Sequence, residues 1–251
     1  MEERGAITIV PGDLCICVGG GNIGSDTALL AKAKGAVVVV IDQDPGCKAG
    51  RVADSLQRSV DELDLITPGM VELLISDGVA GLIAIMRKRT PKAVIPAMPG
   101  HLAALAARSV AAEKGIELSP DRGGARMIGR ALPSSLSALI YPESALIVTS
   151  FAPVDKICPL DCSQPTVCPL TGTAHAAPMH DILNETFERL LEDFVVLISH
   201  QLGSFGALEG SAVERAFRLA SSIEEGRTLG IATACRCHGI VSILRSGRGR
   251  L

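Results

Sequence analysis

Short apolar runs alternate with longer mixed segments through the first half of the chain. Runs rich in β-branched residues predict buried strands, and the longer segments between them predict helices. Strands and helices that alternate in this way are typical of an α/β fold with a doubly wound parallel sheet. The predicted elements are strand 14–18, helix 26–34, strand 36–41, strand 72–76, helix 79–89, strand 93–97 and helix 101–114.

The second half has a different order of elements. It predicts strands 138–140 and 145–149, helix 181–191, strand 194–199, helix 209–223 and strands 229–234 and 239–244. On both helices the apolar residues share one face. This order indicates a small α+β domain, with a ferredoxin-like arrangement as one candidate. A loop-like segment at 120–126 separates the halves. We therefore expect a Rossmann-like nucleotide-binding domain at 1–125 and an α+β cysteine-rich domain at 126–251.

A glycine-rich turn follows the first predicted strand. The run Gly19-Gly20-Gly21-Asn22-Ile23-Gly24 fits G-x-G-x-x-G, and a predicted helix and a second strand follow it. In such a unit the first glycine permits a tight turn, the second lets the backbone approach a pyrophosphate, and the third lets the helix pack closely. The helix N-terminus favours the anion.

An aspartate ends the second predicted strand. An acidic side chain at the position of Asp42 accepts hydrogen bonds from the adenine ribose and repels a 2′-phosphate, so NAD is favoured over NADP. Another nucleotide, S-adenosylmethionine, or no ligand at all are the alternatives. The predicted cofactor-binding residues are Gly19, Gly21, Asn22, Ile23, Gly24, Asp42, Asp44 and Asp77.

Two stretches of this unit resemble a known family. Gly-Gly-Gly-Asn-Ile-Gly and Lys-Gly-Ala-Val-Val-Val-Val-Ile-Asp-Gln-Asp-Pro are similar to the Rossmann domains of potassium-transport regulators of the RCK type. The resemblance covers about residues 13–46 and implies a nucleotide site. The rest of the chain departs from that family, in which the cysteine segment has no counterpart.

Five of the eight cysteines indicate a metal site. Cys158, Cys162 and Cys168 fall within eleven residues, and Cys235 and Cys237 come later in the chain. Thiolates select zinc, copper(I) or iron–sulfur clusters. Proline follows two of these cysteines, as in bacterial ferredoxins, which favours a 4Fe-4S cluster over zinc, although the spacing fits neither common template. Buried structural thiols or a disulfide are the alternatives. A shared centre requires the end of strand 145–149 to lie beside Cys235.

Two histidines are candidates for proton transfer. His101 follows the strand at 93–97, where loops border the crevice of a parallel sheet, although a structural contact at a helix start explains it equally well. His238 adjoins Cys237. Nicotinamide transfers a hydride whereas a cluster transfers single electrons, so direct exchange would need a flavin or substrate between them. An open iron that acts as a Lewis acid would avoid that mismatch.

Composition narrows the function classes. The net charge is −3, from 24 basic and 27 acidic residues, and aromatic residues make up 2%. Neither nucleic acid nor a membrane is therefore expected as a partner. No secretory signal is evident, so the expected location is cytoplasmic. We expect an iron–sulfur or metal-containing oxidoreductase that binds NAD and acts on a small molecule, either alone or as a homodimer. The alternatives are a nucleotide- and redox-sensing regulatory protein and an enzyme with a purely structural zinc site.

Overall fold

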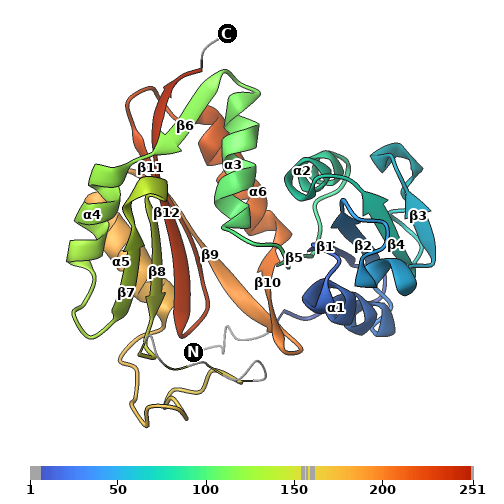
Figure 1. Cartoon of the computed structure of the whole chain (residues 1–251), viewed down its shortest axis with the longest axis horizontal. Helices are drawn as coiled ribbons and strands as arrows, with labels where there is room; N and C mark the ends of the chain where they lie inside the picture. Colours follow the sequence, from blue (N-terminus) through green and yellow to red (C-terminus); the bar gives the residue numbers. More distant parts are fainter. Residues whose placement is uncertain (1–6, 154–155, 157, 159–161, 250–251) are drawn as a thin grey trace. The chain divides into compact units, whose positions relative to one another are not determined.

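The computed structural model describes residues 7–153, 156, 158 and 162–249 (Figure 1). These residues form a mixed α/β structure, which confirms the predicted class. The chain divides into two compact units. The first consists of the residues up to Leu102 together with His200–Glu214, and the second of Ala103–Ser199 together with the residues from Arg215 onward.

Most elements have the type and place that the sequence predicts. The elements of the first unit are β1 (Leu14–Val18), α1 (Asn22–Ala33), β2 (Val37–Asp42), η1 (Lys48–Arg51), β3 (Ser55–Gln57), η2 (Val60–Glu62), β4 (Val71–Ile75), α2 (Gly78–Lys88), β5 (Ala93–Pro96) and β10 (Phe205–Glu209). Those with most of their residues in the second unit are α3 (Leu102–Ala112), β6 (Ile116–Pro120), α4 (Arg122–Ala131), β7 (Ser137–Tyr141), η3 (Pro142–Ser144), β8 (Leu146–Ser150), α5 (Met179–Leu190), β9 (Asp193–Leu202), α6 (Gly210–Ser222), β11 (Thr228–Ala234) and β12 (His238–Arg248).

The sheet of the first unit is parallel except at one edge. β4, β2, β1 and β5 lie side by side in that order, β3 extends the sheet beyond β4, and β10 pairs antiparallel with β5. Every residue of β1 is buried, as expected for a central strand of a parallel sheet. Because Val18 pairs with Ile41, the carboxyl ends of β1 and β2 open at the same edge.

The sheet of the second unit is mixed. β9 pairs parallel with β11, and β12, β8 and β7 follow as antiparallel neighbours. β12 begins where β8 ends, because His238 pairs with Ser150. The cysteine segment after β8 and the turn after β11 therefore start from the same end of the sheet, as a shared centre requires. Figure 1 shows α4 and α5 beside this sheet, where Ile128 and Phe187 enter its core.

The segment at 120–126 is not a loop, so that expectation is wrong. It begins α4, because the Asp121 side chain caps the helix by accepting a hydrogen bond from the Gly124 amide at 2.8 Å, and Ala125 and Ile128 are buried. β6 precedes it and pairs with the last residues of β12, with Leu118 opposite Ser246. The second unit therefore begins at Ala103 and not at residue 126. In the described part of the chain, no helix is long and apolar enough to span a membrane.

Candidate functional site

The glycine-rich turn joins β1 to α1 at the carboxyl edge of the sheet. Gly19 has a φ of +111°, and a Cβ there would collide with the carbonyl oxygen of Ala97. A Cβ on Gly24 would collide with the carbonyl oxygen of Gly19. Gly21 differs, because a Cβ there would meet no atom within 4 Å. The fold itself therefore needs glycine at 19 and 24, whereas the space at Gly21 is open.

The Asp42 carboxylate, at the end of β2, holds this turn in place. One of its oxygens accepts a hydrogen bond from the Gly20 amide at 2.6 Å, and the other accepts one from the Asp44 amide at 2.9 Å. A carboxylate can accept about four hydrogen bonds, so two further donors can be accommodated. The side chain is only partly buried, which leaves it accessible to ribose hydroxyls.

The start of α1 is open at the same edge. Gly21 is the N-cap residue and supplies no side-chain hydrogen bond, and Asn22 and Ile23 are exposed. Free amides in the first turn of a helix carry partial positive charge and bind anions. The structure thus brings the predicted residues 19–24 and Asp42 together.

A segment that the sequence did not single out lies against the turn. The Ala49 amide donates to the carbonyl oxygen of Gly20 at 2.9 Å, and the Cys47 sulfur occupies the space that a Cβ on Gly20 would need. Nothing in the sequence around Cys47 indicates this contact.

Two predicted site residues have structural partners. The Asp77 side chain caps α2 by accepting hydrogen bonds from the amides of Val79 and Ala80, each at 3.0 Å, and it accepts a third from Gln43 at 3.2 Å. The Asp44 carboxylate accepts a hydrogen bond from the Gly46 amide at 2.8 Å. These contacts explain both aspartates without a ligand, so their part in cofactor binding stays a prediction.

His101 is buried directly before α3. Only 6% of its surface is exposed, and burial lowers the pKa of its imidazole to about 3. The ring is therefore uncharged at neutral pH and is a poor proton donor there. The catalytic role stays a prediction that this environment does not favour.

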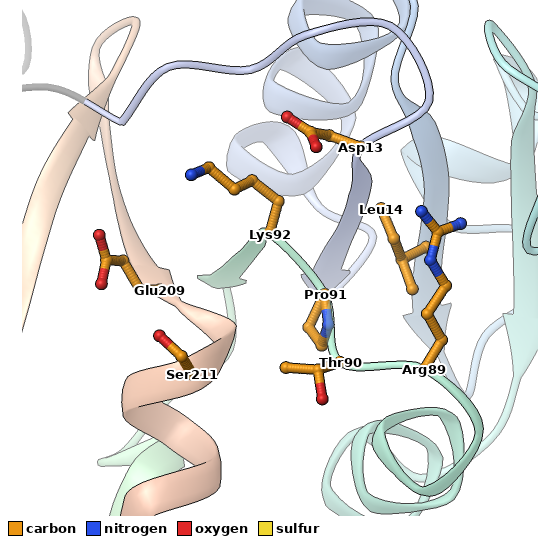
Figure 2. A pocket seen from close by; sticks show the side chains of 8 residues that line it. All are labelled: Asp13, Leu14, Arg89, Thr90, Pro91, Lys92, Glu209 and Ser211. Carbon is orange, nitrogen blue, oxygen red and sulfur yellow. The ribbon is translucent and has the colours of Figure 1, made fainter.

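A concavity of about 340 Å³ lies at the other edge of the parallel sheet (Figure 2). Figure 2 shows Asp13 and Leu14 at the start of β1 and Lys92 just before β5, with Glu209 facing them. The guanidinium of Arg89 donates to the carbonyl oxygens of Leu65 and Gly12. Ligands of parallel α/β sheets bind at the carboxyl ends of the strands. We therefore assign the site to the glycine-rich turn and not to this concavity.

In the second unit, the turn from Cys235 to His238 joins β11 to β12. The Cys235 sulfur accepts hydrogen bonds from the amides of Cys237 at 3.4 Å and His238 at 3.3 Å. The two ring nitrogens of His238 lie 3.8 Å from the Cys235 sulfur and 3.4 Å from the Cys158 sulfur. Burial and the neighbouring His175 lower the pKa of His238. Its predicted role in catalysis is untested, and its observed partners are thiols.

Cys168 is buried in the loop before α5. Its sulfur accepts hydrogen bonds from the Thr171 hydroxyl and from the amides of Thr171 and Leu170, which lower the pKa of the thiol. Hydrogen bonds to sulfur stabilise the charged thiolate. Thr171 was not predicted, because a contact within an irregular loop leaves no periodic signal.

The other four predicted metal ligands lie within electrostatic range of Cys237. Burial raises the pKa of the Cys237 thiol to about 12, and the other four cysteines add to that rise: Cys235, Cys162, Cys168 and Cys158. All eight cysteines of the chain are free thiols, so no disulfide is formed. Among the residues that the structure describes, no three His, Cys, Asp or Glu side chains are placed to hold one metal ion. The metal site therefore stays a prediction.

Comparison with known proteins identifies relatives. A family model described as "Uncharacterized protein, C-terminal domain" matches residues 104–247. An uncharacterized protein of Archaeoglobus fulgidus is 30% identical over 231 residues, which cover 92% of this chain and 98% of that protein.

Two solved structures also match, with low similarity. The ADP complex of purK, N5-carboxyaminoimidazole ribonucleotide synthetase, is 16% identical, with a TM-score of 0.29 over 93% of this chain and 47% of that chain. The Staphylococcus aureus N5-carboxyaminoimidazole synthetase with ADP is 12% identical, with a TM-score of 0.25 over 94% and 48%. This chain spans about half the length of either structure, and at these TM-scores the likeness carries no argument about fold or activity. The chain belongs to the family that the C-terminal domain model describes, together with the Archaeoglobus fulgidus protein.

Proposed function

We propose that this protein is an oxidoreductase that binds NAD at the glycine-rich turn of its first unit and holds a metal centre on the thiols of its second unit. The observation that carries the proposal is the open space at Gly21, at a turn whose other two motif glycines are required by packing. A ligand that needs close approach to the backbone explains why Gly21 has no side chain.

The order of the strands supports the same assignment. The parallel order β4, β2, β1, β5 is that of strands 3, 2, 1 and 4 in a Rossmann fold. We therefore propose a Rossmann-like fold for the first unit, in line with the RCK-type resemblance of residues 13–46. A ferredoxin-like arrangement of the second unit stays a prediction, because its sheet also contains the parallel pair β9 and β11.

Asp42 supports NAD over NADP. Its carboxylate accepts hydrogen bonds from two backbone amides and can accept further ones from the hydroxyls of an unmodified ribose. The negative charge of the same carboxylate would repel a 2′-phosphate. The nicotinamide would supply hydride transfer: oxidation of a small molecule gives NADH, a proton and the oxidised product. The chain's own contribution in this unit is to hold the pyrophosphate on the amides at the start of α1.

Calorimetric titration tests this proposal. Wild-type protein should bind NAD more tightly than NADP and ATP. The Asp42→Asn variant should lose most of the discrimination, because the charge that repels the 2′-phosphate is gone. We expect the ratio of the NADP and NAD dissociation constants to fall at least about tenfold, equivalent to 1.4 kcal/mol.

A glycine variant in the second unit serves as the control. Gly123→Ala adds a Cβ in ordinary contact with Asp121, 3.4 Å away, and should leave the ratio unchanged. If wild-type protein binds ATP but neither dinucleotide, the proposal is wrong. If NAD binds but Asp42→Asn keeps the wild-type ratio, the ribose is not recognised at Asp42.

A further inference from the structure

The sheet of the second unit has an open edge at β7. β7 pairs with β8 on one side, and among the described residues no strand pairs with its other side (Figure 1). Its sequence is Ser-Ala-Leu-Ile-Tyr, which contains neither a charged residue nor a proline. Proteins commonly protect an edge strand with such residues, because its free amides and carbonyl oxygens can pair with another chain. β7 therefore has the properties of a strand to which a further strand can add.

Apolar side chains are exposed on both faces of β7. Ile140 lies against α4, because a Cβ on Gly129 would collide with the Ile140 side chain. Side chains of a strand alternate between its two faces, so Leu139 and Tyr141 point away from α4. These two side chains are 42% and 49% exposed. A strand added at this edge would cover apolar surface on the face opposite α4.

Arginines line the same edge on the face that α4 covers. Arg122, Arg126 and Arg130 are spaced by four along α4 and therefore share one side of the helix. Arg122 forms an ion pair with Glu143, which lies in η3 directly after β7. This contact indicates that the arginine side of α4 faces the β7 edge. Arg126 and Arg130 are exposed and have no acidic partner in the part of the chain that the structure describes.

A second copy of this chain would fit the edge poorly. Two copies of β7 that pair antiparallel are related by a twofold axis perpendicular to the sheet, so the two α4 helices would lie on the same face. Their arginine rows would then meet across the seam, where like charges repel each other. An acidic strand would instead bring opposite charges to Arg126 and Arg130.

We propose that β7 is a docking site for an extended segment of another protein in which acidic and apolar residues alternate. The segment adds to the sheet as a strand, and its backbone pairs with the free amides and carbonyl oxygens of β7. Because side chains alternate between faces, its carboxylates face Arg126 and Arg130 while its apolar side chains cover Leu139 and Tyr141. The inference concerns the second unit alone and does not depend on the proposed oxidoreductase activity.

Two synthetic peptides test the charge pattern on the wild-type protein. Fluorescence anisotropy at low salt should show binding of a labelled peptide of about seven residues in which glutamate and valine alternate. The matched peptide with lysine in place of glutamate should bind at least about tenfold more weakly, and high salt should reduce that difference. Equal binding of the two peptides, or no binding of the glutamate peptide at protein concentrations up to about 1 mM, would overturn the proposal.

Charge reversal tests where the peptide binds. The double variant Arg126→Glu and Arg130→Glu should prefer the lysine peptide over the glutamate peptide. The same reversal at Arg51 and Arg58, two exposed arginines on either side of the edge strand β3 in the first unit, is the matched control and should keep the wild-type preference. An unchanged preference in the α4 variant, or a reversed one in the control, would overturn the assignment. Far-ultraviolet circular dichroism checks that each variant is folded.

Hydrogen exchange and sedimentation test the strand itself. The glutamate peptide should slow exchange of the wild-type amides at 137–141, and protection confined to other residues would contradict docking at β7. Leu139→Glu should leave the particle mass of the peptide-free protein unchanged. If wild-type protein is a dimer that Leu139→Glu dissociates, the edge binds a second copy of the chain and the proposal is wrong.

Discussion

At the scale of single residues, environment decides which candidate side chains can take part in chemistry. Asp42 is partly buried and keeps acceptor capacity after it has bound two amides. His101 is the opposite case, because burial lowers the pKa of its imidazole to about 3 and keeps it uncharged. From the sequence alone both residues are candidate site residues, because the sequence shows residue types but not their burial.

His101 should make the stability of the protein depend on pH. Its folded-state pKa of about 3 lies below the unfolded value of about 6.5. Between these two pH values His101 is protonated in the unfolded chain but not in the folded one. The contribution of His101 to the free energy of unfolding is therefore fully present above about pH 6.5 and is lost as the pH falls toward the folded-state pKa. Lowering the pH from 7 to 5 should remove about 2 kcal/mol through this group. Urea unfolding of wild type and His101→Gln at both pH values measures it.

The His101→Gln variant carries no titratable group at this position and should lose correspondingly less stability between pH 7 and pH 5. Identical losses in the two proteins would mean that His101 is protonated equally in the folded and unfolded chains.

At the scale of elements, the sequence predicts strands and helices well where hydrophobic runs decide them. The predicted strand at 14–18 coincides with β1, because all five residues are buried. α4 was missed, because its ten residues include three glycines and three arginines and contain no apolar run. Its start also depends on the Asp121 cap, which the hydrophobic pattern does not show. β6 was missed because its pairing with β12 joins residues far apart in the sequence. The glycine turn was predictable from its spacing, whereas the contact with Cys47 was not.

Asp77 illustrates how an element can account for a residue that was predicted to bind a cofactor. Asp77→Ala removes the acceptor for two amides at the start of α2, so it should lower the free energy of unfolding by about 1 kcal/mol. Asp77→Asn, which keeps a capping oxygen, should restore most of that loss. Urea unfolding measures both variants, and NAD titration should give the same dissociation constant for each. Weaker NAD binding by Asp77→Asn at unchanged stability would return Asp77 to the cofactor site.

At the scale of the whole molecule, the two units differ in how much the sequence reveals. The family match begins at residue 104, beside the start of the second unit at Ala103. The predicted boundary fell later because the loop-like composition at 120–126 hides β6 and α4. The return of His200–Glu214 to the first unit could not be predicted either, since it depends on the pairing of β10 with β5. The first unit carries the nucleotide motif, and the second brings together thiols from two distant segments.

The central claim is that a dinucleotide binds at the β1–α1 turn, and hydrogen exchange measured by mass spectrometry with and without NAD tests it most directly. The account predicts that NAD slows exchange in peptides that contain residues 19–24 and 42–47. Gly21→Ala should abolish this effect while exchange elsewhere stays as in wild type, because its Cβ enters only open space. NAD-dependent protection confined to other peptides, or equal protection in Gly21→Ala, would contradict the account.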